Sequence, residues 1–250
     1  MSSVFLTRFS GATYTPPRSL TVHGFSRPRV VPLIDLAGRD GAVVSRRSQL
    51  EPRRGALQGT LRAATWTDAQ ALLNALLAAM QDAPLQLRLG SATGRFITVW
   101  PENVDDTATT RPAWLTVNVP LVAPDPYFYA HAETWDSLGA ASQSVWNAGD
   151  AIVEPLIRIV GGTGGASAIT IGNTTTGQSV TFSGTVSAGQ VLLIDPVRRT
   201  ATRAGVGVLT LVNQPFRVSG FRLNPGANTI TRSFTGAVTA FHLVYRARWL

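Results

Sequence analysis

The sequence predicts a mainly β protein of two domains, an α+β first half followed by an all-β second half. Three observations lead to this prediction. Hydrophobic residues alternate with period two through most of the chain, helical periodicity appears once, and a proline-rich aromatic segment stands at the middle. A chain of 250 residues has room for two domains, which we place at residues 1–130 and 131–250.

In the first half, one helix is predicted over residues 68–82. Thr67 and Gln70 match a capping box, Asp68 suits the positive end of the helix dipole, and Pro84 ends the pattern. The apolar residues of this segment fall on one stripe, which we expect to pack on a sheet: Leu72, Leu73, Leu76, Leu77 and Met80. Alternating segments on both sides predict the strands of that sheet, at residues 57–61, 85–89, 95–100 and 114–121. An acidic turn containing Asp105 and Asp106 separates the last two.

Residues 38–55 have a different composition and predict a protruding hairpin or arm. Asp40-Gly41 is a turn dipeptide of tight hairpins. Four arginines follow it among few core residues: Arg46, Arg47, Arg53 and Arg54. An ordinary solvated loop is the alternative, since charged segments rich in glycine are common on surfaces.

The central segment is predicted to be a stiff connector between the domains. Its prolines fix φ and favour extended geometry, so it can be neither helix nor a good central strand. Leaving three adjacent aromatic rings exposed to water would give up the large free energy gained by burying them. We therefore expect these rings to pack against one or both domains and to fix the connector there. The junction residues are Pro124, Asp125, Pro126, Tyr127, Phe128 and Tyr129.

The second half predicts a β sandwich of jelly-roll type. About eight short apolar runs are broken by Gly, Asn and Pro at intervals of about ten residues. We expect residues 161–165 and 173–177 to be turns or loops. The predicted strands are residues 152–160, 168–171, 178–182, 190–194, 198–203, 216–223, 228–234 and 238–249.

Composition narrows the function classes. Hydrophobic residues make up 44% and charged residues 14%, which suits a protein that hides surface in an assembly. All 22 basic residues are Arg, either as an effect of genomic base composition or because Arg is the better interface cation. The net charge of +8 is spread over both halves, so no half is a dedicated nucleic-acid arm. The N-terminus lacks a signal-peptide pattern and no stretch has the length of a membrane span, so we expect the protein to be made and kept in a cytosol, or to leave it by a route other than secretion.

No catalytic, cofactor or metal site is predicted. The absence of cysteine excludes thiol catalysis, disulfides and zinc-thiolate sites. His23, His131 and His242 are isolated, and His242 is expected to be a hydrogen-bonded structural histidine. Glycines 161–165 lack the lysine and the helix of a phosphate loop. The adjacent Asp105 and Asp106 are better explained by a solvated turn than by a cation site or glycoside hydrolysis.

Saccharide binding remains an alternative class. Sugar sites on β sandwiches combine an exposed aromatic ring with polar side chains. Trp135, Trp146 and Trp249 are the candidates, although core or junction positions are the expected role of all three. A carbohydrate-binding or adhesin-like module is therefore the main competing function.

The order of several motifs resembles the distal tail protein family of long-tailed bacteriophages, a siphovirus-type tail component. The resemblance spans nearly the whole chain. Its elements are the capped helix, the boundary Ala123-Pro-Asp-Pro-Tyr-Phe-Tyr129, the turn at Asn147-Ala-Gly149, the run Ile169-Thr-Ile-Gly-Asn173, and Asn224-Pro-Gly-Ala-Asn228 before the last strands. It implies a split-barrel-like first domain that forms a hexameric ring, and a galectin-like second domain that projects outward.

The resemblance also implies partners and a location. The ring would join the tail tube protein to the tail hub or tail-associated protein, and the second domain could hold side fibres or a receptor-binding protein. The protein would assemble in the bacterial host cytoplasm and reside in the virion, without specific nucleic-acid binding or membrane insertion. A closed ring needs two different patches on each subunit. We expect Arg46, Arg47, Arg53 and Arg54 of one subunit to meet Asp105 and Asp106 of the next.

Overall fold

The structure is a computed structural model that describes residues 4–8, 13–26, 30–35, 42–81, 83–89, 94–103, 105–108, 113–213 and 220–250. The chain divides into two compact units. Unit 1 comprises Met1–His131 with the terminal Leu250, and unit 2 comprises Ala132–Trp249. Each unit has its own hydrophobic core.

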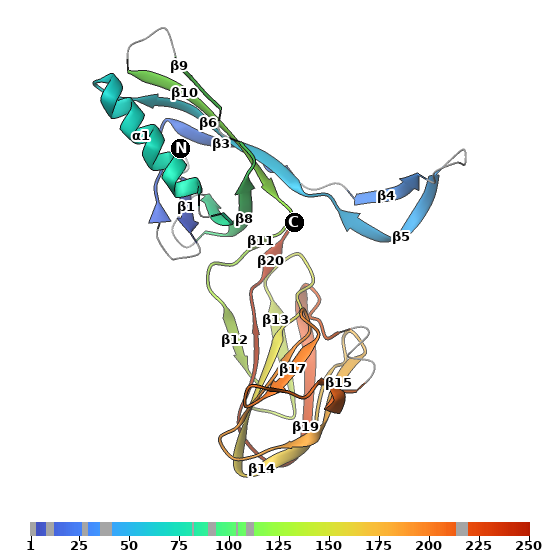
Figure 1. Ribbon diagram of the computed structural model, residues 1–250. Coiled ribbons are helices and arrows are strands. Elements are labelled where there is room, and N and C mark those ends of the chain that lie inside the picture. The colour runs from blue at the N-terminus through green and yellow to red at the C-terminus, as the bar shows by residue number, and fades with distance from the viewer. Residues whose placement is uncertain are drawn as a thin grey trace. The chain divides into compact units, whose positions relative to one another are not determined.

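Unit 1 contains one helix and a set of antiparallel strands within the described residues (Figure 1). Its elements are β1 (Val4–Arg8), β2 (Thr13–Tyr14), β3 (Leu20–Gly24), β4 (Val30–Asp35), β5 (Ala42–Leu50), β6 (Arg53–Arg62), α1 (Trp66–Met80), β7 (Leu85–Leu89), β8 (Phe96–Pro101), β9 (Asp105–Ala108), β10 (Trp114–Ala123) and β11 (Phe128–Tyr129).

The main sheet of unit 1 is split into two parts that share few residue pairs. Its strand order is β2-β1-β7-β8-β10-β6-β3. β10 pairs with β6 along its whole length, but it meets β8 only at Leu121 and Val122. The predicted strands at 85–89, 95–100 and 114–121 are confirmed as β7, β8 and β10. The predicted acidic turn is wrong in part, because Asp105 and Asp106 lie in β9, which pairs with β10.

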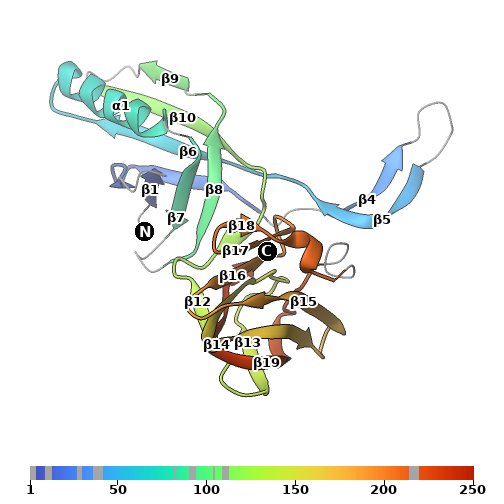
Figure 2. The ribbon, with the colours of Figure 1, turned by 60° about the horizontal axis from the view of Figure 1, so that its bottom comes forward.

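The helix α1 packs on β6 and β10, as Figures 1 and 2 show. The predicted helix is confirmed, but its cap is not Thr67. Thr65 is the N-cap, and its hydroxyl accepts a hydrogen bond from the Asp68 amide at 3.2 Å. The helix therefore starts two residues earlier than predicted, and it ends at Met80. Its buried face comprises Ala69, Leu73, Leu76, Ala79 and Met80.

Unit 2 is all β apart from one turn of 3₁₀ helix in its described part. Its elements are β12 (Thr134–Ser137), β13 (Ser142–Asn147), β14 (Leu156–Asn173), β15 (Gln178–Val186), β16 (Val191–Asp195), β17 (Thr200–Arg203), β18 (Val206–Gly207), η1 (Leu209–Leu211), β19 (Gly226–Tyr245) and β20 (Arg248–Trp249). β12 and β13 were not predicted from the sequence. The predicted run at 216–223 falls partly outside the described residues.

Two long strands run through both sheets of the sandwich. In one sheet, the start of β19 pairs with the end of β14, and this pair is flanked by β13 on the β19 side and by β15 on the β14 side. The other end of the same β14–β19 pair is flanked by β12 and by β16, with β17 and β18 beyond. We call these half-sheet I (β13, β19, β14, β15) and half-sheet II (β12, β19, β14, β16, β17, β18). One core cluster joins the inner faces of both.

The bend between the half-sheets lies at a run of glycines. Between Val160 and Thr170 the β14–β19 register shifts three times, and Gly164, Gly165 and Gly236 have positive φ. The prediction of a loop at 161–165 is therefore wrong, because these residues interrupt the ladder without ending the strand. The turn predicted at 173–177 is confirmed and joins β14 to β15.

Candidate functional site

The arm predicted at residues 38–55 falls on β5 and the start of β6, β5 pairs with β4 before it, and the predicted turn Asp40-Gly41 lies outside the described residues. β4 and β5 form a separate two-stranded sheet, and in the described residues neither strand pairs with the main sheet (Figure 2). Arg46 and Arg47 lie in β5, and Arg53 and Arg54 are the first residues of β6. The four arginines therefore do not share one hairpin.

Arg53 is buried within its own chain. It is 4% exposed, and its Nε donates to the Pro126 carbonyl at 2.5 Å. Its Nη1 donates to the carbonyls of Phe25 at 3.0 Å and Ser26 at 3.3 Å, and its guanidinium lies 5.0 Å from the Phe128 ring centroid. The prediction that Arg53 meets a neighbouring subunit is corrected, because a buried guanidinium with these partners cannot reach another chain.

A sequence signal for this burial exists in the phase of β6. Side chains of a strand alternate between its faces, and Leu57 and Leu61 point to the core. Arg53 lies an even number of residues before Leu57 and therefore on the same face of the strand. Arg54 lies on the opposite face. The prediction missed this because it treated both arginines as part of the arm.

Arg53 joins three segments that are far apart in sequence. Phe25 and Ser26 follow β3 and lead toward the hairpin, Arg53 follows the hairpin, and Pro126 belongs to the connector between the units. Both ends of the arm and the connector are thus fixed to one side chain. Movement of the arm relative to the sheet must strain the same hydrogen bonds that hold the connector.

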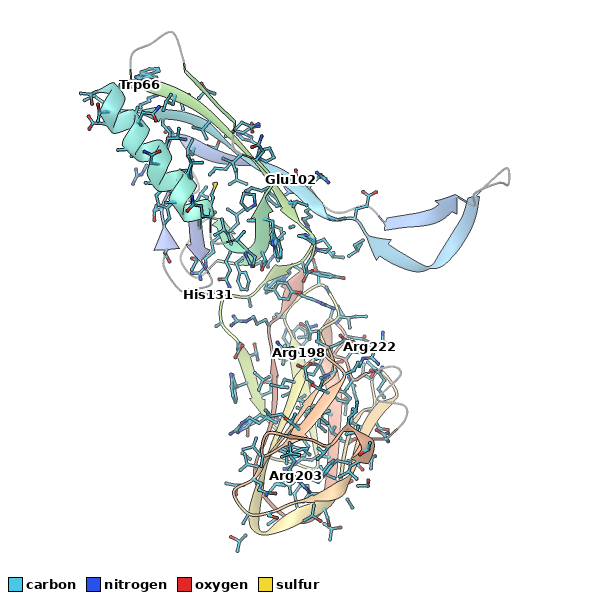
Figure 3. The ribbon with its side chains drawn as sticks, in the orientation of Figure 1. Trp66, Glu102, His131, Arg198, Arg203 and Arg222 are labelled. Atoms are coloured by element: carbon cyan, nitrogen blue, oxygen red, sulfur yellow. The ribbon has the colours of Figure 1, made fainter. Side chains whose placement is uncertain are left out.

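Arg54 faces solvent and pairs with Glu102, which is labelled in Figure 3. Its Nη1 lies 2.9 Å from Glu102 Oε1, and the two side chains are 72% and 41% exposed. An exposed pair of this kind contributes little to stability, so Arg54 can exchange Glu102 for an acid of another chain.

Asp105 and Asp106 lie in an edge strand. β9 pairs with β10 through residues Leu115 to Asn118, and no other strand of the described chain pairs with β9. The free edge of β9 is a place where a strand of another chain can add. The side chains of Asp105, Asp106, Arg46 and Arg47 lie outside the described part of the structure, so the predicted contact stays a prediction.

The connector is fixed to unit 1 by its aromatic residues, one of the two outcomes that the sequence predicts. Phe128 packs against the unit 1 core, and the Tyr129 ring stacks on Phe96 with 5.9 Å between ring centroids. Asp125 accepts hydrogen bonds from the Tyr127 amide at 3.3 Å and the Tyr129 hydroxyl at 2.6 Å. Pro126 is buried and Pro124 is exposed. The connector is therefore an ordered part of unit 1 up to Tyr129.

The candidate chemical groups do not form a reactive site in the described residues. No group of three or more His, Asp or Glu side chains there is close enough to hold a metal ion. His23 contacts the Thr21 hydroxyl at 2.7 Å and is exposed, which suits a surface role. The hydrogen-bonded role predicted for His242 is wrong for one atom, since its Nδ1 is buried without a hydrogen-bond partner.

The tryptophans proposed for saccharide stacking are more exposed than predicted. Trp135 is 54% exposed and Trp146 is 66% exposed, so neither is a core residue. Both lie on edge strands, in β12 and β13. Trp249 is half-buried. Edge strands place alternate side chains in solvent, which explains the exposure.

Buried asparagines shape the end of unit 2 where half-sheet I turns. Asn173 donates to the Arg222 carbonyl at 2.8 Å and to Asn228 Oδ1 at 3.1 Å. Asn228 in turn donates to the carbonyls of Asn224 and Gly226. Asn147 folds its own turn by accepting from the Gly149 amide and donating to the Ala151 carbonyl. These asparagines satisfy backbone groups in tight turns, which is a structural role.

Residues 148–249 match the family model of the siphovirus-type tail component, C-terminal domain. These residues are thus similar to the C-terminal domain of siphovirus-type tail components. The matched residues include β14 to β20. No curated protein sequence matches the chain.

Solved structures of similar fold extend the likeness over the whole chain. The crystal structure of the Dit protein of phage SPP1 matches 99% of this chain with 99% of its own, at a TM-score of 0.75 and 17% identity. That protein is described as a paradigm of the hub adsorption apparatus in phages infecting Gram-positive bacteria. Two structures of the phage P2 baseplate in its activated conformation, with calcium and with strontium, match 98% of both chains. Their TM-scores are 0.51 and 0.50, at 6% and 7% identity.

At these identities the solved structures establish the fold alone. The predicted fold class, mainly β with an α+β first domain and a galectin-like tail-component domain, is confirmed. Within the described residues, no helix combines the length and apolar character required to cross a membrane.

Proposed function

We propose that this protein is a distal tail protein, six copies of which form a ring that joins the tail tube to the tail-tip hub. The observation that carries the proposal is the fold match to the phage SPP1 Dit protein over 99% of both chains, together with the tail-component domain at residues 148–249. The second domain anchors side fibres or a receptor-binding protein. Tail tube protein and hub protein are the partners on the two faces of the ring.

The separate β4–β5 hairpin supports ring formation. A two-stranded sheet without further cover is marginally stable in water, so it gains most from a partner. β9 offers a free edge that carries Asp105 and Asp106, while β5 carries Arg46 and Arg47. A hairpin of one subunit adding to β9 of the next is a heterologous contact, which closes into a ring.

The ring is tested by the mass and shape of the purified full chain. Native mass spectrometry should give six times the 26.6 kDa chain mass, and electron microscopy should show a closed ring. A chain that stays monomeric at about 10 μM, a concentration well above that at which stable oligomers dissociate, would contradict the proposal. Adding purified tail tube protein then distinguishes a ring that needs a template from one that never forms.

A carbohydrate-binding module is the second candidate, favoured by the exposed rings of Trp135 and Trp146. A glycan array probed with the full chain separates the two functions. Binding that is lost on Trp135→Ala or Trp146→Ala, from a protein that forms no ring, would assign the chain to that class. No enzymatic activity and no specific nucleic-acid binding are proposed.

A further inference from the structure

The two outer faces of the unit 2 sandwich differ in chemistry although the same two strands build both. On half-sheet I, the outward side chains of β13, β14, β15 and β19 are mostly hydroxyls: Ser142, Ser144, Thr170, Thr181, Thr229 and Thr231. We call this the hydroxyl face. Thr170 and Thr181 lie 3.2 Å apart through their hydroxyl oxygens, as expected for a face that stays in contact with water.

On half-sheet II, the outward side chains of β12, β19, β14 and β16 are mostly apolar. We call this surface the apolar outer face, and its residues are Trp135, Leu156, Val160, Val191, Leu193 and Val244. Apart from Val244 they are half-buried or exposed. The inward neighbours of these residues, such as Ile157, Ile159 and Leu192, are fully buried in the core. Strands that are apolar on both sides are typical of sheets covered on both faces.

Two basic residues stand in the middle of the apolar outer face. Arg158 of β14 and His242 of β19 are register partners, and Leu193 of β16 is the partner of Arg158 on the other side. Trp135, Val244 and Leu156 form the row on one side of this pair. Ala240, Val160 and Val191 form the row on the other.

Neither basic residue has a counter-charge in the described chain. Arg158 makes no hydrogen bond, ion pair or ring contact there. His242 touches the Trp135 ring edge-on, with 5.8 Å between centroids, but its buried Nδ1 has no hydrogen-bond partner. Polar groups that are half-buried among apolar side chains are costly without a partner. The face therefore lacks an acceptor at its centre.

We propose that the apolar outer face binds a segment of another protein that presents a carboxylate flanked by apolar side chains. The carboxylate pairs with the Arg158 guanidinium and accepts from His242, while the apolar side chains cover Trp135, Leu156 and Leu193. Arginine and carboxylate match in a bidentate geometry, which fixes the register of the segment on the strands. The inference rests on the proposed anchoring role of this domain but not on the ring.

The other occupants fit the face less well. A second copy bound about a two-fold axis would place basic residues against the same basic residues. A saccharide needs many hydrogen-bonding groups close together. Beside Arg158 and His242, the outward polar side chains of half-sheet II lie toward its margins, at Ser137, Asp195, Thr200 and Thr202. Its apolar area extends across three strands beyond the single ring of Trp135. A protein segment uses this area fully.

The test is a selection of displayed random peptides on the immobilised full chain, with counter-selection on the double variant Arg158→Gln/His242→Gln. We expect enrichment of peptides that carry Asp or Glu between apolar residues. A synthetic copy of an enriched peptide should bind Arg158→Gln at least about tenfold more weakly, and its Asn or Gln counterpart should bind the parent chain with a similar loss. Leu193→Ser should also weaken binding.

Arg222→Gln is the matched control. It removes the same charge beside Asn173, at the other end of β14, and should leave the affinity within about twofold. Figure 3 labels Arg222. Arg158→Lys keeps the charge and should bind more tightly than Arg158→Gln. Circular dichroism and the melting temperature of each variant must match the parent, so that lost binding is not lost folding.

Three results would overturn the inference. No peptide, or only peptides without an acidic residue, enriches over the counter-selection. The enriched peptide binds Arg158→Gln as tightly as the parent. Glycan binding is lost on Trp135→Ala while no acidic peptide competes, which would assign the face to a saccharide. Ring formation is measured separately, so a hexamer without peptide binding refutes this inference alone, and a peptide-binding monomer refutes only the ring.

Discussion

The Nε atom of Arg53 donates a 2.5 Å hydrogen bond to the carbonyl of Pro126, and this contact ties the start of β6 to the connector between the domains. Residues 73 positions apart are thereby held together by a buried cation. The same guanidinium reaches the carbonyls that follow β3, so the ends of the β4–β5 hairpin meet at this point.

Replacing Arg53 should destabilise the first domain strongly. Arg53→Met keeps much of the side-chain volume but leaves three backbone carbonyls without their donor, and we expect a loss of about 3 kcal/mol in the free energy of unfolding. Urea denaturation followed by tryptophan fluorescence measures it. The control is Arg54→Met, which removes an exposed pair with Glu102 and should cost about 0.5 kcal/mol or less. Equal losses in both variants would show that burial of Arg53 is unimportant.

Charge reversal should break the proposed ring, and a charge swap should restore it. In the double variant Arg46→Glu/Arg47→Glu, like charges replace opposite charges at the contact with Asp105 and Asp106. The hexamer should therefore dissociate already at protein concentrations at which the parent stays assembled, and most readily at low salt, where the repulsion is least screened. Adding Asp105→Arg/Asp106→Arg should recover it. Arg18→Glu, an exposed change outside the hairpin, is the control. Native mass spectrometry gives the readout, and a hexamer unaffected by the reversal would exclude this interface.

Glycines in place of the connector prolines should loosen the joint without unfolding the domains. Pro124 and Pro126 restrict φ on both sides of Asp125, and Gly removes that restriction. We expect the double variant Pro124→Gly/Pro126→Gly to keep its melting transitions within a few degrees and to widen the angular spread between domains in electron micrographs. An unchanged spread would mean that Phe128 and Tyr129, through the unit 1 core and Phe96, hold the connector unaided.

Alkaline pH should destabilise the second domain through Tyr245. Burial, with the hydrogen bond to Asp136 and its charge, raises the pKa of the Tyr245 hydroxyl above the ordinary value of 10.0. The unfolded chain loses this proton near pH 10 and the folded chain holds it to higher pH. The contribution is therefore complete below about pH 10 and is lost as pH rises beyond it.

Tyr245→Phe separates this effect from general alkaline unfolding. The Tyr245 hydroxyl lies 2.8 Å from Asp136 Oδ2 and 3.0 Å from the Trp146 carbonyl, so its removal should cost about 1 kcal/mol at pH 8. The stability of the variant should then fall less steeply with pH above 10 than that of the parent. Urea midpoints at pH 8, 9.5 and 11 test this, and parallel pH curves would contradict it.

The bend between the half-sheets should tolerate no side chain at Gly236. Its φ is +95°, and an added Cβ would lie 2.3 Å from the Gly165 carbonyl oxygen. Gly236→Ala should therefore cost about 3 kcal/mol or more, because backbone must move to admit the methyl group. Gly207→Ala is the control, since a Cβ there meets nothing within 4 Å. The melting temperatures of both variants measure the effect. Equal melting temperatures would show that the added Cβ at Gly236 meets no steric obstacle.

Features with local causes could be predicted from the sequence. The helix and strands β7, β8 and β10 follow from the spacing of their apolar residues. The N-cap was assigned to Thr67 because both threonines are followed, three residues later, by a side chain that can accept a hydrogen bond. This side chain is Asp68 after Thr65 and Gln70 after Thr67. β12 and β13 were missed because edge strands rich in polar residues lack strict alternation.

Features that depend on distant residues could not be predicted. Glycines 161–165 have the composition of a loop, and only pairing with β19 makes them part of a strand. The environment of Arg158 and His242 likewise requires the register of three strands. Of the predicted assembly residues, Arg46, Arg47, Arg54, Asp105 and Asp106 stay proposals. The hydrogen-bond partners of the buried Arg53 could not be predicted, because these carbonyls come from segments far away in the sequence.

The passage of β14 and β19 through both half-sheets bears on how the second domain fails under stress. In a sandwich whose sheets are joined only by loops, one sheet can peel away while the other persists. Here each half-sheet contains half of the same two strands, so separating the layers requires the β14–β19 ladder itself to break. Partial opening therefore has no stable stopping point, and the domain stays closed until it is lost as a whole.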